Sequence, residues 1–364
     1  MSTEAHPAPA PAPARSALGQ DAWRQAVRIT AVSVLGLALV KLMDWPFGVF
    51  FAVYPILLLG LVPVFNRKVA LQFLGSSVAS ITAVNALLVL GSFSPVIGLV
   101  SFLAFSAWCF SLMARTPFFL FGAVTMVSTS VLVHLASHPS TPRPDLFTAQ
   151  FVATLSAIFI SALMHAFLPE RRTIQMRFPD KPVSLVRHQI LLGATCATAS
   201  YAAFQILDLG DSLSAQAATV LVLFPMTLAG GRMATWTRFI GTLFGSAFAV
   251  AMQLVLYTHV SHLALLLPLY ASAMLLFSTM HVREAAGPAV GFGAATAIAV
   301  LIGQLSPRAD LYGISLYRLG SVAVASLLML LCIFATQSLL NLFPATRDVT
   351  GSGPSAARKP GAGP

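Results

Sequence analysis

Charged residues are scarce in this sequence. Only 9% of its residues are Asp, Glu, Lys or Arg, whereas 57% are hydrophobic. Soluble domains carry about 25% charged residues, so the composition excludes a protein that folds in water. The apolar residues also fall in long blocks that lack the polar face of a surface helix. We therefore expect an integral membrane protein whose first partner is the lipid bilayer.

Signatures of enzymes and metal sites are also missing. The sequence contains no GxxxxGK[ST] loop, no HExxH, no GxSxG and no dinucleotide fingerprint. Cys109, Cys196 and Cys332 lie far apart, form no CxxC pair, and are interpreted as small core residues. We expect neither enzymatic activity nor a cofactor or metal, so uphill transport would draw on an ion gradient, first of all protons, or on a partner.

Twelve apolar blocks are long enough to cross a bilayer, which takes roughly 20 residues. No strand-like alternation appears, and lipid requires each segment to pair its own backbone groups, so the blocks are predicted to be helices. The predicted spans are 26–43, 47–65, 69–90, 95–114, 118–136 and 147–168, followed by 188–207, 212–229, 239–257, 263–280, 285–303 and 314–343. The predicted fold class is an all-α integral membrane protein with about twelve transmembrane helices.

The second half of the sequence repeats the first. The aligned pairs are Pro55 and Pro225, Leu58 and Leu228, Gly60 and Gly230, Lys68 and Arg238, and Gly75-Ser76 and Gly245-Ser246. Since six crossings separate the copies, the two six-helix repeats are predicted to be parallel and related by a pseudo-two-fold axis along the membrane normal. Transporters commonly have this duplicated plan.

The repeat divides the chain into five predicted parts. These are a disordered cytoplasmic segment (1–25), a first six-helix repeat (26–169), a basic cytoplasmic linker (170–187), a second six-helix repeat (188–344) and a disordered cytoplasmic tail (345–364). Most of the 21 basic residues fall in the predicted inner segments. By the positive-inside rule both termini are expected in the cytoplasm, and the net charge of +10 needs no nucleic-acid partner.

Ionisable residues inside a membrane are functional candidates, yet no carboxylate falls in the middle of a predicted span. The transport or coupling candidates at the outer span ends are Lys41, Asp44, Asp208 and Asp211, and those in one inner turn are His281, Arg283 and Glu284. A carboxylate beside an imidazole could relay protons. The alternative is that these residues are ordinary solvated helix ends.

Other residues are candidates for a substrate path or for helix packing. Arg232 and Arg238 could bind a carboxylate through their guanidinium groups, and Trp108 with Phe105 could line an aromatic path. The alternatives are positive-inside charge for the arginines and core packing for the rings. Small residues at Gly241 and Gly245, and at Gly75 in the first half, would let helices approach closely.

Two groups of residues carry a family resemblance. One is the run from Pro225 to Ala249, with Arg238-Phe-Ile-Gly-Thr-Leu-Phe-Gly, and the other is the start of the first half, with Arg28, Asp44-Trp45-Pro46 and Pro55. Both resemble the fusaric-acid-resistance and aromatic acid exporter superfamily of bacterial inner-membrane proteins. The chain departs from the larger members because it has no sizeable cytosolic domain between its halves, and because Leu71-Gln72 replaces the Gly-Thr pair in the first half.

The resemblance implies an inner-membrane efflux permease. Such a protein exports aromatic carboxylic acids or related amphipathic toxic compounds, often with a periplasmic membrane-fusion adaptor as partner. Our leading hypothesis adds the proton gradient as the driving force and a homo-oligomer as a further candidate assembly. Two alternatives remain open: a non-transporting scaffold subunit of a larger envelope complex, and a membrane enzyme that uses His134, His138, Asp145, Asp208 or Asp211.

Overall fold

The computed structural model describes residues 19–62, 64–115, 117–169, 181–207, 212–256, 262–284, 289–304 and 311–347. Within these ranges the chain is helical apart from short turns and contains no strand, so the predicted all-α fold is confirmed. Asp208 and Asp211, most of the predicted basic linker, and most of both predicted tails lie outside the described residues.

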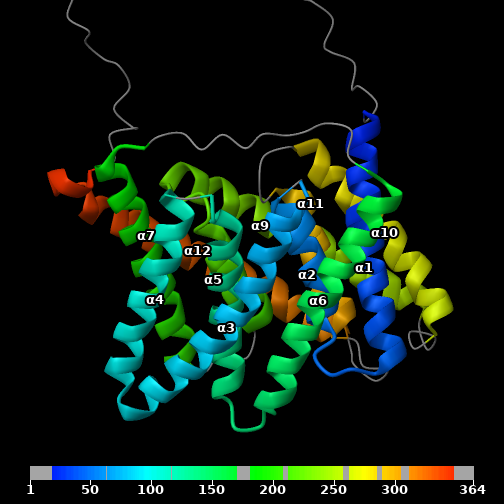
Figure 1. The fold of residues 1–364 in the computed structure, drawn as a ribbon, viewed down its shortest axis with the longest axis horizontal. Coiled ribbons are helices and arrows are strands. Elements are labelled where there is room, and N and C mark those ends of the chain that lie inside the picture. The colour runs from blue at the N-terminus through cyan, green and yellow to red at the C-terminus, as the bar shows by residue number, and fades with distance from the viewer. Residues whose placement is uncertain are drawn as a thin grey trace, which may run out of the picture.

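The described ranges contain twelve α-helices (Figure 1). In the first half they are α1 (Gln20–Met43), α2 (Val49–Leu61), α3 (Arg67–Phe93), α4 (Pro95–Arg115), α5 (Phe119–Ser137) and α6 (Arg143–Phe167). In the second half they are α7 (Val183–Ile206), α8 (Ala217–Val222), α9 (Leu228–Leu256), α10 (Leu263–Glu284), α11 (Val290–Gly303) and α12 (Leu311–Leu340). A π-helical turn η1 (Ser212–Gln216) precedes α8, and a 3₁₀ turn η3 (Pro344–Thr346) follows α12.

Eight of these helices are long and apolar enough to cross a membrane, namely α1, α3, α4, α5, α6, α9, α10 and α12 from Ser315 onward. Helix α7 is long enough, but its hydropathy is lower. The helices α2, α8 and α11 have 13, 6 and 14 residues, fewer than the roughly 20 that a straight crossing takes. The expected full-length helices over 47–65, 212–229 and 285–303 are therefore wrong in length.

Pro225 explains the largest of these differences. The α-helical conformation ends at Val222, and Met226 adopts a positive φ of 52°. Proline has no N–H to donate and blocks the preceding turn of a helix, so the chain breaks here and starts again as α9. As a result α9 begins at Leu228, well before the predicted start at residue 239. Its repeat partner Pro55 is tolerated inside α2.

The short helices α2, α8 and α11 share the interior of the bundle with α5. Most residues of these four helices are buried, and their side chains form much of one continuous apolar core. Longer helices such as α3, α4, α9 and α12 expose many large apolar side chains. An apolar exposed face is what contact with lipid requires, so the longer helices form the outer layer.

The packing of the helices repeats between the halves. Helix α3 packs against α5 as α9 packs against α11, and α1 packs against α6 as α7 packs against α12. The contacts between the halves also come in equivalent pairs. The contact of α1 with α10 corresponds to that of α7 with α4. The contact of α2 with α11 corresponds to that of α8 with α5. This arrangement matches two copies related by a pseudo-two-fold axis, while the exact boundaries of the repeats stay a prediction.

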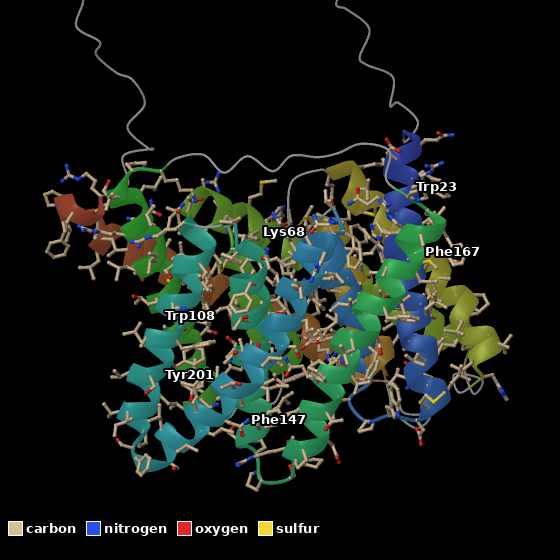
Figure 2. The ribbon with its side chains drawn as sticks, in the orientation of Figure 1. Trp23, Lys68, Trp108, Phe147, Phe167 and Tyr201 are labelled. Atoms are coloured by element: carbon tan, nitrogen blue, oxygen red, sulfur yellow. The ribbon has the colours of Figure 1, made fainter. Side chains whose placement is uncertain are left out.

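In each half, a side chain of the first helix contacts the backbone just beyond the end of the sixth helix. Arg28 of α1 donates from Nη1 to the carbonyl oxygen of Leu168 at 2.9 Å, just beyond the end of α6. In the second half, Nδ1 of His188 on α7 lies 2.7 Å from the carbonyl oxygen of Thr346, just beyond the end of α12. Figure 2 shows Phe167 at the same end of the bundle as Trp23. Each half therefore starts and finishes on one side of the molecule.

Arginines at the opposite end repeat the same pattern. Arg143, the first residue of α6, donates from Nε to the carbonyl oxygen of Ala136 near the end of α5 at 2.9 Å. Arg318, near the start of α12, donates to the side-chain oxygen of Gln304 at the end of α11. In both halves an arginine thus fixes the start of the sixth helix to the end of the fifth.

Candidate functional site

Arg238 lies inside the bundle, ten residues after the start of α9 and thus about 15 Å along the helix axis. Its Nη1 donates to Oγ1 of Thr296 on α11 at 2.7 Å. Its Nε atom is shut off from solvent and has no hydrogen-bond partner among the described residues. Within the described ranges no carboxylate forms an ion pair with this guanidinium group. The Thr296 hydroxyl is thus the hydrogen-bond partner of this guanidinium group among the described residues, while the arginine side chain as a whole is half-buried.

Glycines allow α9 and α11 to approach closely enough for this contact. A Cβ atom added to Gly241 would lie 2.6 Å from the carbonyl oxygen of Val290, and one added to Gly245 would lie 2.6 Å from that of Ala294. Neither distance is compatible with a side chain. Gly75, which the repeat aligns with Gly245, has more room, because an added Cβ would meet only the ring of Phe121 at 3.3 Å.

His281 and Glu284 lie at the same end of α11. The carboxylate of Glu284 accepts a hydrogen bond from the backbone N–H of Gly291 at 2.9 Å, which satisfies one of the free donors at the start of this helix. His281 is almost fully buried, and its Nε2 lies 3.0 Å from the carbonyl oxygen of Gly60 at the end of α2. Its ring also packs against Phe292 at a centroid distance of 5.5 Å.

These contacts bring together three residues that the sequence analysis selected for different reasons. We call Arg238, His281, Glu284, Phe292 and Thr296 the α11 site. All of them contact the first two turns of α11 or belong to it. The N-terminus of a helix carries a partial positive charge, which adds to that of Arg238. The site therefore favours an anion, with Glu284 offsetting part of the positive charge.

A very small cavity borders Arg238. It is lined by Leu221, Val222, Ala234, Arg238, Ala289, Phe292 and Gly293. Its volume of about 10 Å³ is sufficient for roughly one water molecule. An organic ligand fits in this cavity only if α9 and α11 move apart from α8, so the cavity beside Arg238 is closed to such a ligand in this structure.

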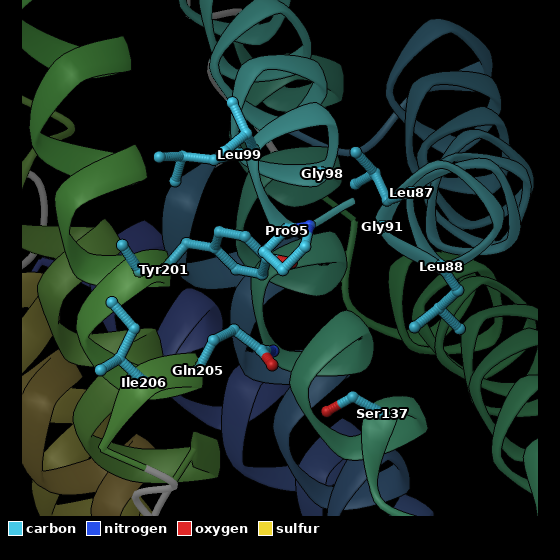
Figure 3. A pocket seen from close by; sticks show the side chains of 12 residues that line it. Leu87, Leu88, Gly91, Pro95, Gly98, Leu99, Ser137, Tyr201, Gln205 and Ile206 are labelled. Atoms are coloured by element: carbon cyan, nitrogen blue, oxygen red, sulfur yellow. The ribbon is translucent and has the colours of Figure 1, made fainter. Parts of the chain in front are cut away.

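A larger cavity of about 490 Å³ lies at the other end of the bundle, between α3, α4 and α7 (Figure 3). Tyr201 of α7 points toward it, and its ring stacks on Phe102 with centroids 4.1 Å apart and planes 10° apart. Gln205 lines the same cavity, and its Nε2 lies 3.4 Å from Nδ1 of His134. We call this space the outer cavity, because it lies at the end of the bundle that is predicted to face outward. It has an aromatic wall and a polar edge.

Tyr201 and Gln205 are not among the residues predicted from the sequence, and His134 and His138 were predicted candidates only for an enzyme. The structure places Nε2 of His138 3.4 Å from Nε2 of His134. The four-residue spacing of the two histidines on one helix face was a usable signal. Nothing in the sequence indicated that Gln205, on a helix of the other half, would join them.

The predicted coupling candidates at the outer ends lie far along the chain from the α11 site and in different surroundings. Asp44 is exposed and ends α1 in the left-handed conformation, with φ 51°. Lys41 lies in the last turn of the same helix. At the end predicted to face the cytoplasm, Arg232 and Arg283 are exposed, unlike Arg238 and His281. Of these four residues, only Arg283 adjoins the α11 site along the chain, because it lies between His281 and Glu284 in the last turn of α10.

Trp108 lies on an outward face of α4, where 44% of its surface is exposed (Figure 2). Its ring packs against Phe105 at 5.9 Å and edge-on against Phe121 at 5.8 Å. This aromatic group joins α4 to α5 on the surface that faces lipid. A role of Trp108 and Phe105 in a substrate path stays a prediction. Among the described residues, no group of three or more His, Cys, Asp or Glu residues could hold a metal ion.

In comparisons with known proteins, each half of the chain matches a different family. Residues 197–332 match the family described as fusaric acid resistance protein-like, and residues 25–164 match a family described as a protein of unknown function. No curated protein and no solved structure matches the chain. The first match confirms the resemblance found in the sequence, and with the apolar helices it supports a multi-pass membrane protein with an efflux-like transport role.

Proposed function

Because residues 197–332 match the family described as fusaric acid resistance protein-like, we propose that the protein is an efflux permease for aromatic carboxylic acids or related amphipathic toxic compounds. It would take its substrate from the cytoplasm, with the proton gradient as the driving force. The proposed location is the bacterial inner membrane, with both termini in the cytoplasm. A periplasmic membrane-fusion adaptor would receive the substrate, and assembly into a homo-oligomer is part of the same proposal.

The observation that carries this proposal is the guanidinium group of Arg238. A charged side chain inside a membrane protein is unfavourable unless it is paired, and such residues commonly belong to substrate or ion pathways. Arg238 has only the Thr296 hydroxyl as a partner, and its buried Nε is left without one among the described residues. A carboxylate can accept two parallel hydrogen bonds from a guanidinium group, so an organic acid supplies what this site lacks.

The surroundings of Arg238 favour the aromatic part of the substrate. Apart from the arginine, the small cavity is lined by aliphatic side chains, by Gly293 and by the ring of Phe292. Such a lining binds an apolar ring and offers nothing to a sugar or a polyol. A flat aromatic acid could place its ring against Phe292 while its carboxylate meets Arg238.

The two cavities suggest how access would alternate. The α11 site is closed to about 10 Å³, whereas the outer cavity has about 490 Å³. A substrate would bind at Arg238 in an inward-open state and leave through a space of the outer cavity's size. The contacts of α2 with α11 and of α5 with α8 are part of the interface between the halves, together with those of α1 with α10 and of α4 with α7, so a rocking motion would occur there.

His281 is the proton-binding residue in this proposal. It is nearly buried, connects α10 to the end of α2, and packs against Phe292 of the α11 site. Protonation of the imidazole would turn its second nitrogen into a donor and change its contacts with α2 and α11. The same ring would thus respond to the proton and touch the binding site.

Uptake into inverted membrane vesicles tests the proposed function. Vesicles with an imposed pH gradient, acid inside, should accumulate labelled benzoate or a substituted benzoate, and a protonophore should abolish the accumulation. Vesicles that carry Arg238→Gln should accumulate little, whereas those with Lys68→Gln should behave like the wild type. Equal accumulation with and without the gradient, across a broad panel of aromatic acids, would contradict the proposal.

A further inference from the structure

Two of the three cysteines meet inside the second half. Cys196 on α7 and Cys332 on α12 are separated by 136 residues, yet their Sγ atoms are 3.5 Å apart. Both thiols are free, and Oγ1 of Thr336 lies 3.6 Å from Sγ of Cys196. The third cysteine, Cys109, is buried on α4. The fold therefore creates a close pair of thiols that the sequence spacing gave no reason to expect.

A cavity gives access to this pair. It has a volume of about 600 Å³ and lies between α7, α12 and the segment formed by η1 and α8. Cys332 lines it together with Ser200, Thr219, Val324 and Leu328, among other residues. Cys332 is only partly buried, while Cys196 is fully buried behind it. The volume is in the range of pockets that hold small organic ligands.

We propose that Cys196 and Cys332 form a binding site for trivalent organic arsenicals, with the organic group in this cavity. Trivalent arsenic is soft and pyramidal, so one arsenic atom bonds two sulfurs at an angle near a right angle. Two sulfurs in van der Waals contact are already close to the separation that such a bridge needs. The apolar walls, made largely by Ala199, Phe204 and Leu328, suit an aryl or alkyl substituent.

The reaction is a condensation that needs no oxidant. An arsonous acid, R–As(OH)₂, loses its two hydroxyl groups, and two As–S bonds replace the two As–O bonds. Each thiol proton leaves with one hydroxide as water, and arsenic stays in the trivalent state. The exposed part of Cys332 would react first, and the bound arsenic would then be held beside Cys196.

Other ligands fit the pair less well. Structural zinc takes four ligands, and no group of three or more His, Cys, Asp or Glu residues lies together among the described residues. A linear thiolate complex of Cu(I) would require the two sulfurs to move apart. A disulfide would need a two-electron oxidant, whereas binding of a trivalent arsenical needs none. The inference stands independently of the proposed export of aromatic acids.

Phenylarsine oxide is the probe for this site. We expect purified full-length wild-type protein to bind one arsenic atom per chain, stable to dilution and reversed by 2,3-dimercaptopropanol. Proteolysis and mass spectrometry should recover a peptide from α7 joined to a peptide from α12 through arsenic. Recovery of the arsenic on Cys109, or no binding by the folded wild-type protein, would overturn the proposal.

Single substitutions provide the matched comparison. Cys196→Ala and Cys332→Ala should each weaken retention of the arsenical about a hundredfold, because the second bond of a bridged ligand forms at a high effective concentration. Cys109→Ala should retain it like the wild type. The thermal unfolding of each variant checks its folding, and the wild-type peptide map decides the question if a variant does not fold. Unchanged retention in either folded pair variant would overturn the proposal.

Discussion

Lys68 and Arg238 occupy aligned positions in the two halves, but their surroundings differ completely. Lys68 is the second residue of α3 and is exposed at one end of the bundle (Figure 2). Arg238 is ten residues into α9, where its Nε is shut off from solvent. The cause is the early start of α9, because the break at Pro225 allows the helix to begin at Leu228. The aligned basic position thus carries an exposed lysine in one half and a half-buried arginine with a buried Nε in the other.

The contacts between neighbouring helices differ between the two halves in the same way. In the first half Gln72 connects α3 to the start of α5, since its Oε1 accepts from the backbone N–H of Phe121 at 3.3 Å. In the second half Arg238 connects α9 to α11 through Thr296. The equivalent helix contact is therefore neutral in one half and charged in the other. The duplicated fold keeps its packing scheme, and the proposed anion site belongs to the second copy.

The largest expected effect is that of Arg238→Gln. Glutamine still donates to Thr296 but cannot pair with a carboxylate. The loss of one partner from a buried, hydrogen-bonded charge pair costs about 2 kcal/mol or more, so the KM for an exported aromatic acid should rise roughly thirtyfold or more. Initial rates in inverted vesicles measure this change.

Lys68→Gln is the matched control, and it should leave the KM unchanged because Lys68 is exposed. Equal effects of the two substitutions would show that the halves do not differ as described.

The second expected effect concerns the helix approach. Gly241→Leu introduces the residue that the first half has at the aligned position, Leu71. Its Cβ would meet the carbonyl oxygen of Val290 at 2.6 Å and Cα of Gly293 at 2.8 Å, so α9 and α11 would be forced apart. Overpacking of this kind destabilises by about 1–3 kcal/mol. Thermal unfolding in detergent should show a clear decrease in the melting temperature.

The reverse change, Leu71→Gly, should cost only about 1 kcal/mol, from helix propensity, because Leu71 is exposed. A larger decrease for Leu71→Gly than for Gly241→Leu would contradict the close approach of α9 and α11.

The third expected effect concerns His281 and distinguishes its role in packing from its proposed role in proton binding. His281→Ala removes the contact with the Gly60 carbonyl and the packing against Phe292, so it should reduce stability by about 1–2 kcal/mol. If His281 binds the coupled proton, transport by the folded variant should no longer depend on the pH gradient. His281→Gln, which can restore the donor to Gly60, should recover stability but not coupling. Full gradient dependence in His281→Gln would exclude the imidazole as the coupling group.

The smallest effect is expected for Asp44→Asn. Asp44 is exposed, and asparagine also tolerates the left-handed conformation that ends α1. Stability should therefore change by only a few tenths of a kcal/mol, within the usual range for surface positions. Transport with unchanged gradient dependence is the expected result in vesicles. A loss of coupling would move the proton pathway to the outer end of α1.

The sequence predicted the fold class well, because composition and block length suffice to identify helices in lipid. It also indicated the repeat, through pairs such as Gly75 with Gly245. It failed on the lengths of α2, α8 and α11, since an apolar block looks the same whether the helix spans the bilayer or stops within the protein. The break after Val222 depends on how Pro225 and Met226 are accommodated, which hydropathy does not record.

The candidate site was predicted in part. Arg238, His281 and Glu284 were selected one by one for their charge or titration, but no sequence rule placed them around the start of α11. Thr296 went unnoticed because a threonine in an apolar helix carries no distinctive signal. The contact between Cys196 and Cys332 likewise depends on the packing of α7 against α12, which the sequence alone does not show.

The central claim is that Arg238 recognises the charge of an aromatic acid. The most direct measurement is the binding of benzoate and of benzamide, its neutral isostere, to purified wild-type protein and to Arg238→Gln by isothermal titration calorimetry. We predict that the wild-type protein prefers benzoate and that the variant binds both ligands weakly and equally. A preference for benzoate that persists unchanged in the variant would contradict the claim.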